Sequence, residues 1–409
     1  VVSLDLPQAP VTCLDFWCRA GSAAETPAES GLAHFLEHMV FKGSDRLGAG
    51  EFDLRVEALG GSSNAATGFD DVHYHVLVPP SAAAEAIDLL LDLVLAPRLD
   101  GQDFAMERQV VLEEVAFQQL LSRACPGHAY GQPILGRRQA LEGHQAGAMA
   151  AFHQRLYRAD NCCLAVAGPL GDGAILDHLE NSALASLASS DQPLSTDAAP
   201  SSPRGRSQAG VRSGAPPLQL HPGSDTVALP RLEAARLLMA WQVPASGDLE
   251  AVIGCDLLTT LLAEGRRSRL VARLREQLRL VESIDLDLNG LEAGSLVLLE
   301  AVCESEHLPA VEAEIKRVLQ ELIAAPPPLA EVERAQRLVG NGYRFGLEAA
   351  GSVAGLLGNN HLWGRHQPIQ APLDALAHWD PQRLWRELTP LLDPERAFWK
   401  RTIGDLDQR

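Results

Sequence analysis

A stretch poor in large apolar residues divides the 409-residue chain between Ala188 and Ser224, and it limits the possible folds more than any other feature. Serine, proline, glycine, alanine and aspartate dominate it. A segment of this composition buries too little apolar surface to offset the entropy lost on ordering. We therefore expect a flexible linker over residues 188–224, between an N-terminal domain at residues 1–187 and a C-terminal domain at residues 225–409.

The two halves on either side of this stretch repeat one order of elements. Each is expected to begin with a strand, followed by a polar loop, a helix, further strands and a long amphipathic helix. The repetition predicts an α+β fold in two homologous domains, each with a mixed or antiparallel sheet flanked by helices. The expected strands lie at residues 11–18, 72–78, 235–243 and 296–302, and the expected helices at residues 31–41, 82–95, 249–262 and 308–323.

The charge and the cysteines narrow the classes of partner and location. A formal net charge of −19 repels phosphate backbones and anionic lipids, so we expect no nucleic acid and no membrane as partner. No apolar run approaches the ~20 residues that a membrane helix needs. The seven cysteines include no CxxC pair, which favours reduced, buried thiols and a cytoplasmic location, with an organelle matrix or stroma as the alternative.

The helix expected over residues 31–41 carries His34, Glu37 and His38, in the pattern HxxEH. Residues four apart lie one turn apart on the same helix face, so the two imidazoles are placed to hold one metal ion, and Ser30 is the expected N-cap. Catalytic zinc takes three protein ligands and activates a water, whose proton a nearby carboxylate such as Glu37 can accept. The pattern is the reverse of HExxH and predicts a zinc peptidase.

A third ligand must come from elsewhere in the chain. Residues 107–115 have helical periodicity, and Glu107 and Glu114, seven apart, lie on one face, whereas Glu113 points about 100° away. We predict Glu114 as the ligand and Glu107 as a carboxylate that orients a ligand histidine or stabilises the site. Taken alone, this pair of glutamates is more often a solvated helix face.

Two other interpretations stay open. Chance produces HxxEH in a chain of this length on the order of a few per cent of the time, so a surface helix with two histidines is one alternative. A rival metal pair is His73 and His75, which alternate onto one face of an expected strand, although no carboxylate completes it in the sequence and strand histidines are common.

The motif and several further stretches resemble the pitrilysin/insulinase family of inverzincin metallopeptidases, and the bacterial and mitochondrial processing peptidase branch is the most similar in length. The resemblance covers nearly the whole chain. It rests on His34 to His38 with Glu107 and Glu114, and on the stretches at residues 60–67, 131–136, 157–161, 268–270 and 274–276.

This resemblance implies a clam-like protein of two homologous α+β domains with one Zn²⁺ per chain. His34, His38 and Glu114 would hold the zinc, and Glu37 would act as general base. The segment around Asn64 and Ala65 would be an edge strand to which an extended peptide substrate adds by backbone pairing. Another interpretation of the glycines that precede this segment is a simple turn.

One position departs from the family. An arginine and a tyrosine seven residues later hold the substrate in family members, and Arg275 matches the arginine, but Glu282 stands at the tyrosine position. An ionised glutamate cannot donate the required hydrogen bond, so Arg275 would bind substrate only in part, or would be a salt-bridge residue. We therefore predict a heterodimer, in which this chain is the catalytic subunit and a related chain supplies the arginine–tyrosine pair.

The leading prediction is a zinc metalloendopeptidase that hydrolyses short or unfolded peptides. The alternative is a non-catalytic scaffold or peptide-binding subunit that retains the zinc motif. Retention of His34, Glu37, His38 and Glu114 favours catalysis, and the substrate and pathway are not specified by the sequence.

Overall fold

The computed structural model describes residues 1–114, 120–171, 173–187, 215–229, 232 and 234–404, without the side chains of residues 109–114, 186 and 229. Most of the predicted linker, residues 188–214, lies outside this part. The chain forms two compact units. Unit 1 contains residues 1–118, 132–215 and 345–369, and unit 2 contains residues 119–131, 216–344 and 370–409. Each unit thus includes a segment from the other half of the sequence.

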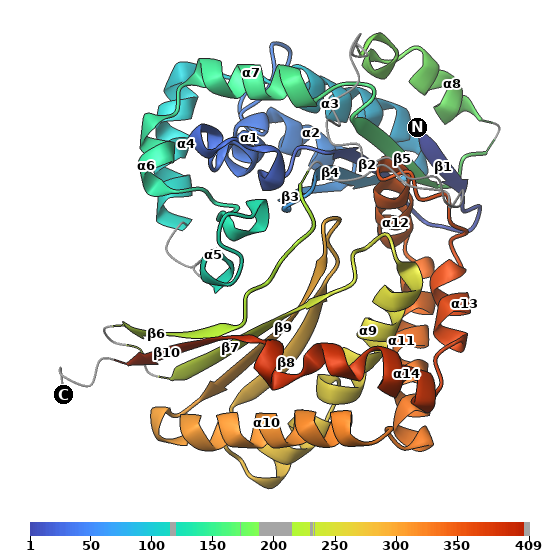
Figure 1. Ribbon diagram of the computed structural model, residues 1–409. Coiled ribbons are helices and arrows are strands. Elements are labelled where there is room, and N and C mark those ends of the chain that lie inside the picture. Colours follow the sequence, from blue (N-terminus) through green and yellow to red (C-terminus); the bar gives the residue numbers. More distant parts are fainter. Residues whose placement is uncertain (115–119, 172, 188–214, 230–231, 233, 405–409) are drawn as a thin grey trace, which may run out of the picture. The chain divides into compact units, whose positions relative to one another are not determined.

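Unit 1 is built on a five-stranded mixed sheet of order β1-β5-β2-β4-β3 (Figure 1). Only β1 and β5 pair in parallel, and the other neighbours are antiparallel. Strand β3 lies at one edge of the sheet. The strands are β1 (Val2–Asp5), β2 (Thr12–Cys18), β3 (Ser62–Thr67), β4 (Val72–Val78) and β5 (Cys162–Gly168).

Unit 2 repeats this topology with the order β6-β10-β7-β9-β8, and its one parallel pair, β6 with β10, takes the place of β1 with β5. The predicted α+β class with a mixed sheet in each of two similar units is thereby confirmed. The strands are β6 (Gly223–Leu229), β7 (Ala235–Val243), β8 (Ser283–Asn289), β9 (Ser295–Cys303) and β10 (Phe398–Gly404).

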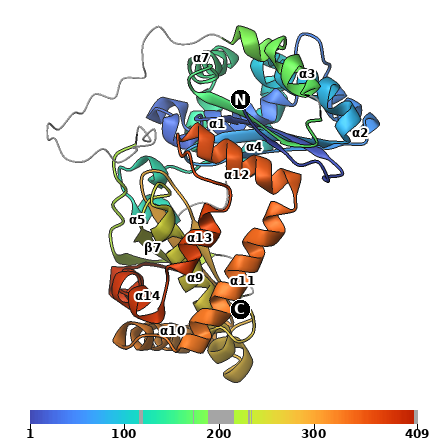
Figure 2. The same cartoon turned by 90° about the vertical axis from the view of Figure 1, so that its right-hand side faces the viewer.

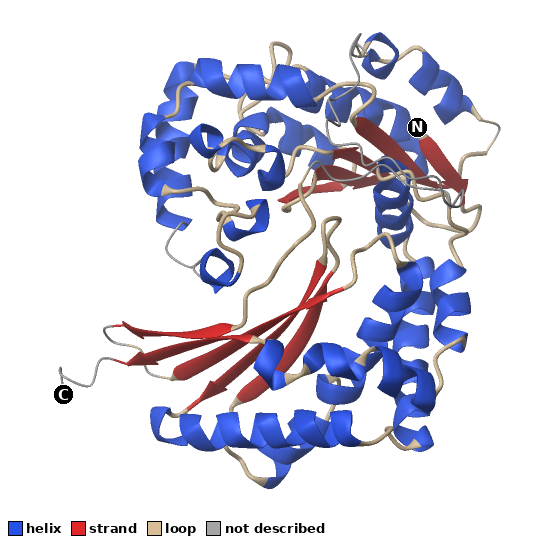
Figure 3. Cartoon of the chain, viewed as in Figure 1, coloured by secondary structure: helices blue, strands red, loops and turns tan. Residues whose placement is uncertain are grey.

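Helices flank both sheets (Figure 3). Alternate residues of β2 and β4 pack with α1 and α3 into the main core of unit 1. Alternate residues of β7 and β9 pack with α9 and α10 into the main core of unit 2.

No helix among the described residues is long and apolar enough to cross a membrane. Unit 1 has α1 (Leu32–Val40), α2 (Glu51–Ala58), α3 (Ala83–Leu95), α4 (Gly101–Glu114), α6 (Arg138–Gly143), α7 (Ala146–Leu156), α8 (Ala174–Glu180) and α12 (Ala350–Leu362). Unit 2 has α5 (Leu120–Ala124), α9 (Leu249–Ala263), α10 (Leu308–Ala324), α11 (Leu329–Leu347, whose last residues fall in unit 1), α13 (Ala371–Ala377) and α14 (Pro381–Glu387).

Helix α12 comes from the second half of the sequence but lies against the sheet of unit 1, where it contacts β1, β2 and β5 (Figures 1 and 2). A Cβ atom at Gly358 would overlap the ring of Trp17, so the absence of a side chain there allows the close approach. The indole of Trp363 donates a hydrogen bond of 3.0 Å to Asp71, which ties the end of this segment to the start of β4. Both faces of the sheet in unit 1 are therefore packed against helices over part of their area.

Candidate metal centre

Helix α1 holds the three residues of the HxxEH pattern. Its apolar side chains, including Phe35, Leu36 and Met39, are fully buried, whereas His34, Glu37 and His38 are only partly buried. The periodicity of the apolar residues therefore turns the three polar ones toward the same less buried side.

The N-terminus of α1 differs from the prediction that Ser30 caps it. The N-cap is Gly31, with φ of 89°, and no side-chain cap hydrogen bond comes from that residue. Instead, the carboxylate of Glu25 accepts hydrogen bonds from the backbone N–H groups of Gly31 and Ala33, at 2.9 and 2.7 Å. The carboxyl oxygens of Glu25 satisfy two exposed N–H groups of the first helical turn, so Glu25 takes the role expected of Ser30.

His34 and His38 lie side by side on α1. Their ring centroids are 4.6 Å apart. Burial and the neighbouring His38 lower the pKa of the His34 imidazole to about 4. His34 is therefore neutral near pH 7, and a neutral imidazole is the form that binds a metal ion.

Glu107 on α4 contacts one of these histidines directly. Its Oε1 lies 2.8 Å from Nδ1 of His38, and its Oε2 forms an ion pair with Lys42. Burial by itself raises the pKa of the Glu107 carboxyl, but hydrogen bonds from Lys42 and His38 outweigh it and lower the pKa below its usual value. An ionised Glu107 that accepts a hydrogen bond from Nδ1–H of His38 leaves Nε2 of His38 as the nitrogen available to a ligand.

Glu37 is joined to the edge strand of the sheet. The hydroxyl of Thr67, at the end of β3, donates a hydrogen bond to Oε2 of Glu37. On the same strand, Ala65 is partly buried against the main core, whereas Asn64 is exposed and its side chain accepts a hydrogen bond from the N–H of Ala65. Within the described part of the chain, β3 pairs with β4 alone, so its other edge is open to a further strand.

The side chain of Glu114, the predicted third ligand, lies outside the described residues. Its backbone ends α4, two turns beyond Glu107. The described donors fit a zinc ion in kind: two imidazoles on one helix face, one of them oriented by a carboxylate, and a further carboxylate beside them. The sequence predicted each of these residues, but it did not indicate that Thr67 and Glu25 would position Glu37 and α1.

In unit 2, Arg275 lies in a helical turn over Val271–Gln277 and forms an ion pair with the adjacent Glu276 at 3.1 Å. Glu276 also binds Arg266. Glu282 is exposed and directly precedes the edge strand β8. Arg275 is thus engaged in a surface ion-pair network, and no described contact joins it to Glu282.

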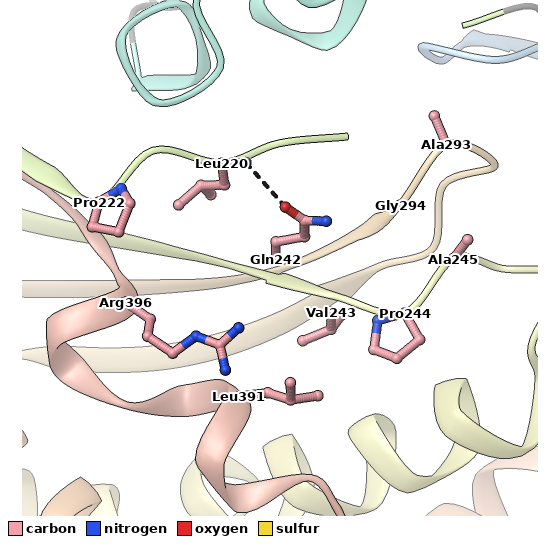
Figure 4. Close-up of a pocket in the computed structure, with 10 residues that line it drawn as sticks. All are labelled: Leu220, Pro222, Gln242, Val243, Pro244, Ala245, Ala293, Gly294, Leu391 and Arg396. Carbon is pink, nitrogen blue, oxygen red and sulfur yellow. Dashed lines mark hydrogen bonds between the residues drawn. The ribbon is translucent and has the colours of Figure 1, made fainter. Parts of the chain in front are cut away.

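A cavity of about 490 Å³ lies beside the end of β7 in unit 2 (Figure 4). The amide of Gln242 is held there, since it accepts from the N–H of Leu220 and donates to the carbonyl of Leu218. Among the described residues that line the cavity, Arg396 is the one that carries a charge. None of the predicted site residues whose side chains the structure describes contributes to its lining.

The rival pair His73 and His75 has a carboxylate beside it that was not predicted from the sequence. Asp15 lies opposite His75 in the register of β2 and β4, and its Oδ1 is 3.0 Å from Nδ1 of His73. A charged residue within the apolar run at residues 11–18 was the available signal, but only strand register shows which residues it meets.

Comparison with known proteins relates both halves of the chain to one family. Residues 1–135 match the family model described as Insulinase (Peptidase family M16), and residues 145–339 match that of the Peptidase M16 inactive domain. The chain is 27% identical to an uncharacterized zinc protease of Mycobacterium leprae, over 92% of this chain and 83% of the relative. It is 32% identical to the uncharacterized zinc protease YmxG of Bacillus subtilis, over 42% of this chain and 44% of the relative.

Solved structures agree on the fold. A protease from Helicobacter pylori superposes with a TM-score of 0.86 at 22% identity, over 98% of this chain and 96% of that one. A structure from Pseudomonas fluorescens, titled as a peptidase M16 inactive domain, gives a TM-score of 0.83 at 17% identity, over 100% and 96%. The predicted relation to the insulinase family is confirmed, while the processing peptidase branch stays a prediction. With both halves matched by models of one family, the chain belongs to peptidase family M16, the insulinase family.

Proposed function

We propose that the chain is a zinc metalloendopeptidase that binds one Zn²⁺ through His34, His38 and Glu114. One observation carries the proposal: two adjacent imidazoles lie on one helix face, with the Glu107 carboxylate 2.8 Å from Nδ1 of one of them. Zinc-binding histidines regularly make this second contact, which sets the tautomer and the ring orientation. The relatives named zinc proteases support the same ion.

Bound zinc supplies Lewis-acid activation of a water and of the peptide carbonyl. Glu37 is the general base in this proposal: it accepts a proton from the attacking water and passes it to the leaving amine. The Thr67 hydroxyl orients the Glu37 carboxylate through its hydrogen bond to Oε2. Since Thr67 belongs to β3, the same strand that would bind the substrate also positions the base.

The substrate class follows from the open edge of β3. An extended peptide that pairs with this edge at Asn64 and Ala65 would be held mainly by backbone hydrogen bonds. Backbone pairing requires an unfolded segment but few particular side chains. We therefore propose short or unfolded peptides of varied sequence as substrates.

Two variants test the proposal. Glu37→Gln keeps the proposed zinc ligands, so it should bind zinc as the wild type does and lose peptide hydrolysis. His38→Ala removes a ligand, so both zinc content and hydrolysis should fall. Glu57→Gln, an exposed residue of α2, is the matched control and should retain both. Hydrolysis by Glu37→Gln at the wild-type rate would remove Glu37 from the mechanism.

We also propose that a related chain completes the active site. Arg275 pairs with Glu276, and the exposed Glu282 stands where the family resemblance expects a tyrosine. Peptide hydrolysis should therefore be slow for the purified chain and rise when a related chain with an arginine–tyrosine pair is added. Full activity of the chain alone, as a monomer or homodimer, would contradict the heterodimer. Zinc binding without hydrolysis under both conditions would instead support a non-catalytic, peptide-binding subunit.

A further inference from the structure

Asp15, His73 and His75 form a second cluster of metal-ligating side chains in unit 1. Each offers one ligand atom, and the three atoms lie within 4.8 Å of one another. The cluster joins two neighbouring strands, since Asp15 is on β2 and both histidines are on β4. It is therefore built on two paired strands of the sheet and not on a loop.

This cluster lies on the opposite face of the sheet from the HxxEH helix. Along β4, Val72, Tyr74 and Val76 are buried in the core that includes α1, and the two histidines alternate with them. Successive side chains of a strand point to opposite faces, so His73 and His75 face away from α1. The two groups of histidines are consequently separate sites.

Packing on this face holds the potential ligands in place. Asp15 is 2% exposed. The imidazole of His73 stacks on the indole of Trp17, with ring centroids 4.2 Å apart and planes 14° from parallel. Helix α12 contacts β2 on this face, and a Cβ atom at its Gly355 would lie 3.8 Å from the second carboxylate oxygen of Asp15.

The distance between two of the three ligand atoms suits a small cation. Oδ1 of Asp15 and Nδ1 of His73 are 3.0 Å apart. Two ligand atoms on a tetrahedral zinc ion, with bonds of about 2.0–2.1 Å, are roughly 3.3 Å apart, so a shift of a few tenths of an ångström would admit the ion. His75, directly opposite Asp15 across the strand pair, would be the third ligand.

We propose that Asp15, His73 and His75 bind a divalent transition metal ion of the zinc class, independently of the HxxEH motif. A carboxylate with two imidazoles favours zinc, cobalt or nickel over calcium or magnesium. The ion takes the position between Asp15 and Nδ1 of His73, and a neutral His73 then carries its one proton on Nε2. It links β2 to β4 and leaves a fourth position for water.

Cobalt titration of the full-length chain tests this site once the first is removed. In a His34→Ala/His38→Ala background, we expect one Co²⁺ per chain, with visible d–d absorption and quenching of tryptophan fluorescence through Trp17. Adding Asp15→Asn or His75→Asn should weaken this binding at least tenfold. Asp88→Asn removes the carboxylate of an exposed Asp–His pair, with His178 at 2.9 Å, and should leave cobalt binding unchanged.

Each result decides the proposal. His75→Asn leaves the contact between His73 and Asp15 in place, so it remains informative even if the buried Asp15→Asn variant does not fold. Absence of saturable cobalt binding in the double variant would overturn the proposal. So would binding that neither Asp15→Asn nor His75→Asn weakens, for instance at the exposed cluster of Glu304, Glu306 and His307.

Discussion

We expect replacement of Glu107 by alanine to weaken zinc binding at the HxxEH site by about 10- to 100-fold, the usual cost of losing a carboxylate that orients a ligand histidine. Glu107 lies 2.8 Å from Nδ1 of His38 and is largely buried. Its removal frees the imidazole to rotate and to change tautomer. At about 1.4 kcal/mol per tenfold change, the expected loss of binding free energy is about 1.4 to 2.8 kcal/mol.

The ion pair with Lys42 places the expected loss in the upper half of this range. Without Glu107, the ammonium group of Lys42 keeps its charge near His38, where it repels a divalent cation. Glu107→Gln keeps an oxygen that can accept from Nδ1 but removes the negative charge. Its affinity should therefore fall between those of the wild type and Glu107→Ala, and Lys42→Met in the Glu107→Ala background should recover part of the loss.

Competition with a chromophoric chelator at pH 7 measures these affinities, and thermal melts check that each variant folds. Glu57→Gln serves as the control, since it removes an exposed carboxylate from α2. A Glu107→Ala variant that binds zinc within twofold of the wild type would refute the role assigned to the carboxylate. Equal losses for Glu107→Ala and Glu107→Gln would assign the effect to charge alone.

Three further predictions concern packing, pH and catalysis. A Cβ at Gly254 would overlap a neighbouring tryptophan ring, whereas one at Gly342 would meet nothing within 4 Å. Gly254→Ala should therefore lower the free energy of unfolding by about 1–3 kcal/mol in urea denaturation, and Gly342→Ala should not lower it. Burial raises the pKa of Glu25 from 4.5 to about 8 despite its backbone hydrogen bonds. Between these two pH values the native state therefore holds a proton on Glu25 that the unfolded chain has released. The contribution of the Glu25 carboxyl to the free energy of unfolding is complete below pH 4.5 and is lost as the pH rises to about 8. Glu25→Gln should therefore flatten the decline in melting temperature over this pH range. Parallel curves of melting temperature against pH for the wild type and Glu25→Gln would contradict the assignment. Thr67→Val removes the hydroxyl that binds Glu37 and should lower kcat about tenfold at unchanged zinc content, whereas Thr67→Ser should retain activity.

The sequence alone determined the positions of several helices and strands and the placement of His34 and His38 on one helix face, because both depend on local spacing. The strand predicted at residues 235–243 coincides with β7, and the helix at residues 308–323 differs from α10 by one residue. His34 and His38 could be placed side by side because residues four apart share a helix face. The repeated order of elements likewise predicted two sheets of one kind, which the matching strand orders confirm.

Only the tertiary structure decided which distant residues meet. The contacts of Thr67 with Glu37, His73 with Asp15, and His38 with Glu107 span 30, 58 and 69 residues. The bond from Trp363 to Asp71 spans 292 residues and brings a segment of the second half into unit 1. Such contacts depend on strand register and helix packing. The periodicity of a sequence shows which face of a helix or strand is apolar, but it does not show which other element packs against that face.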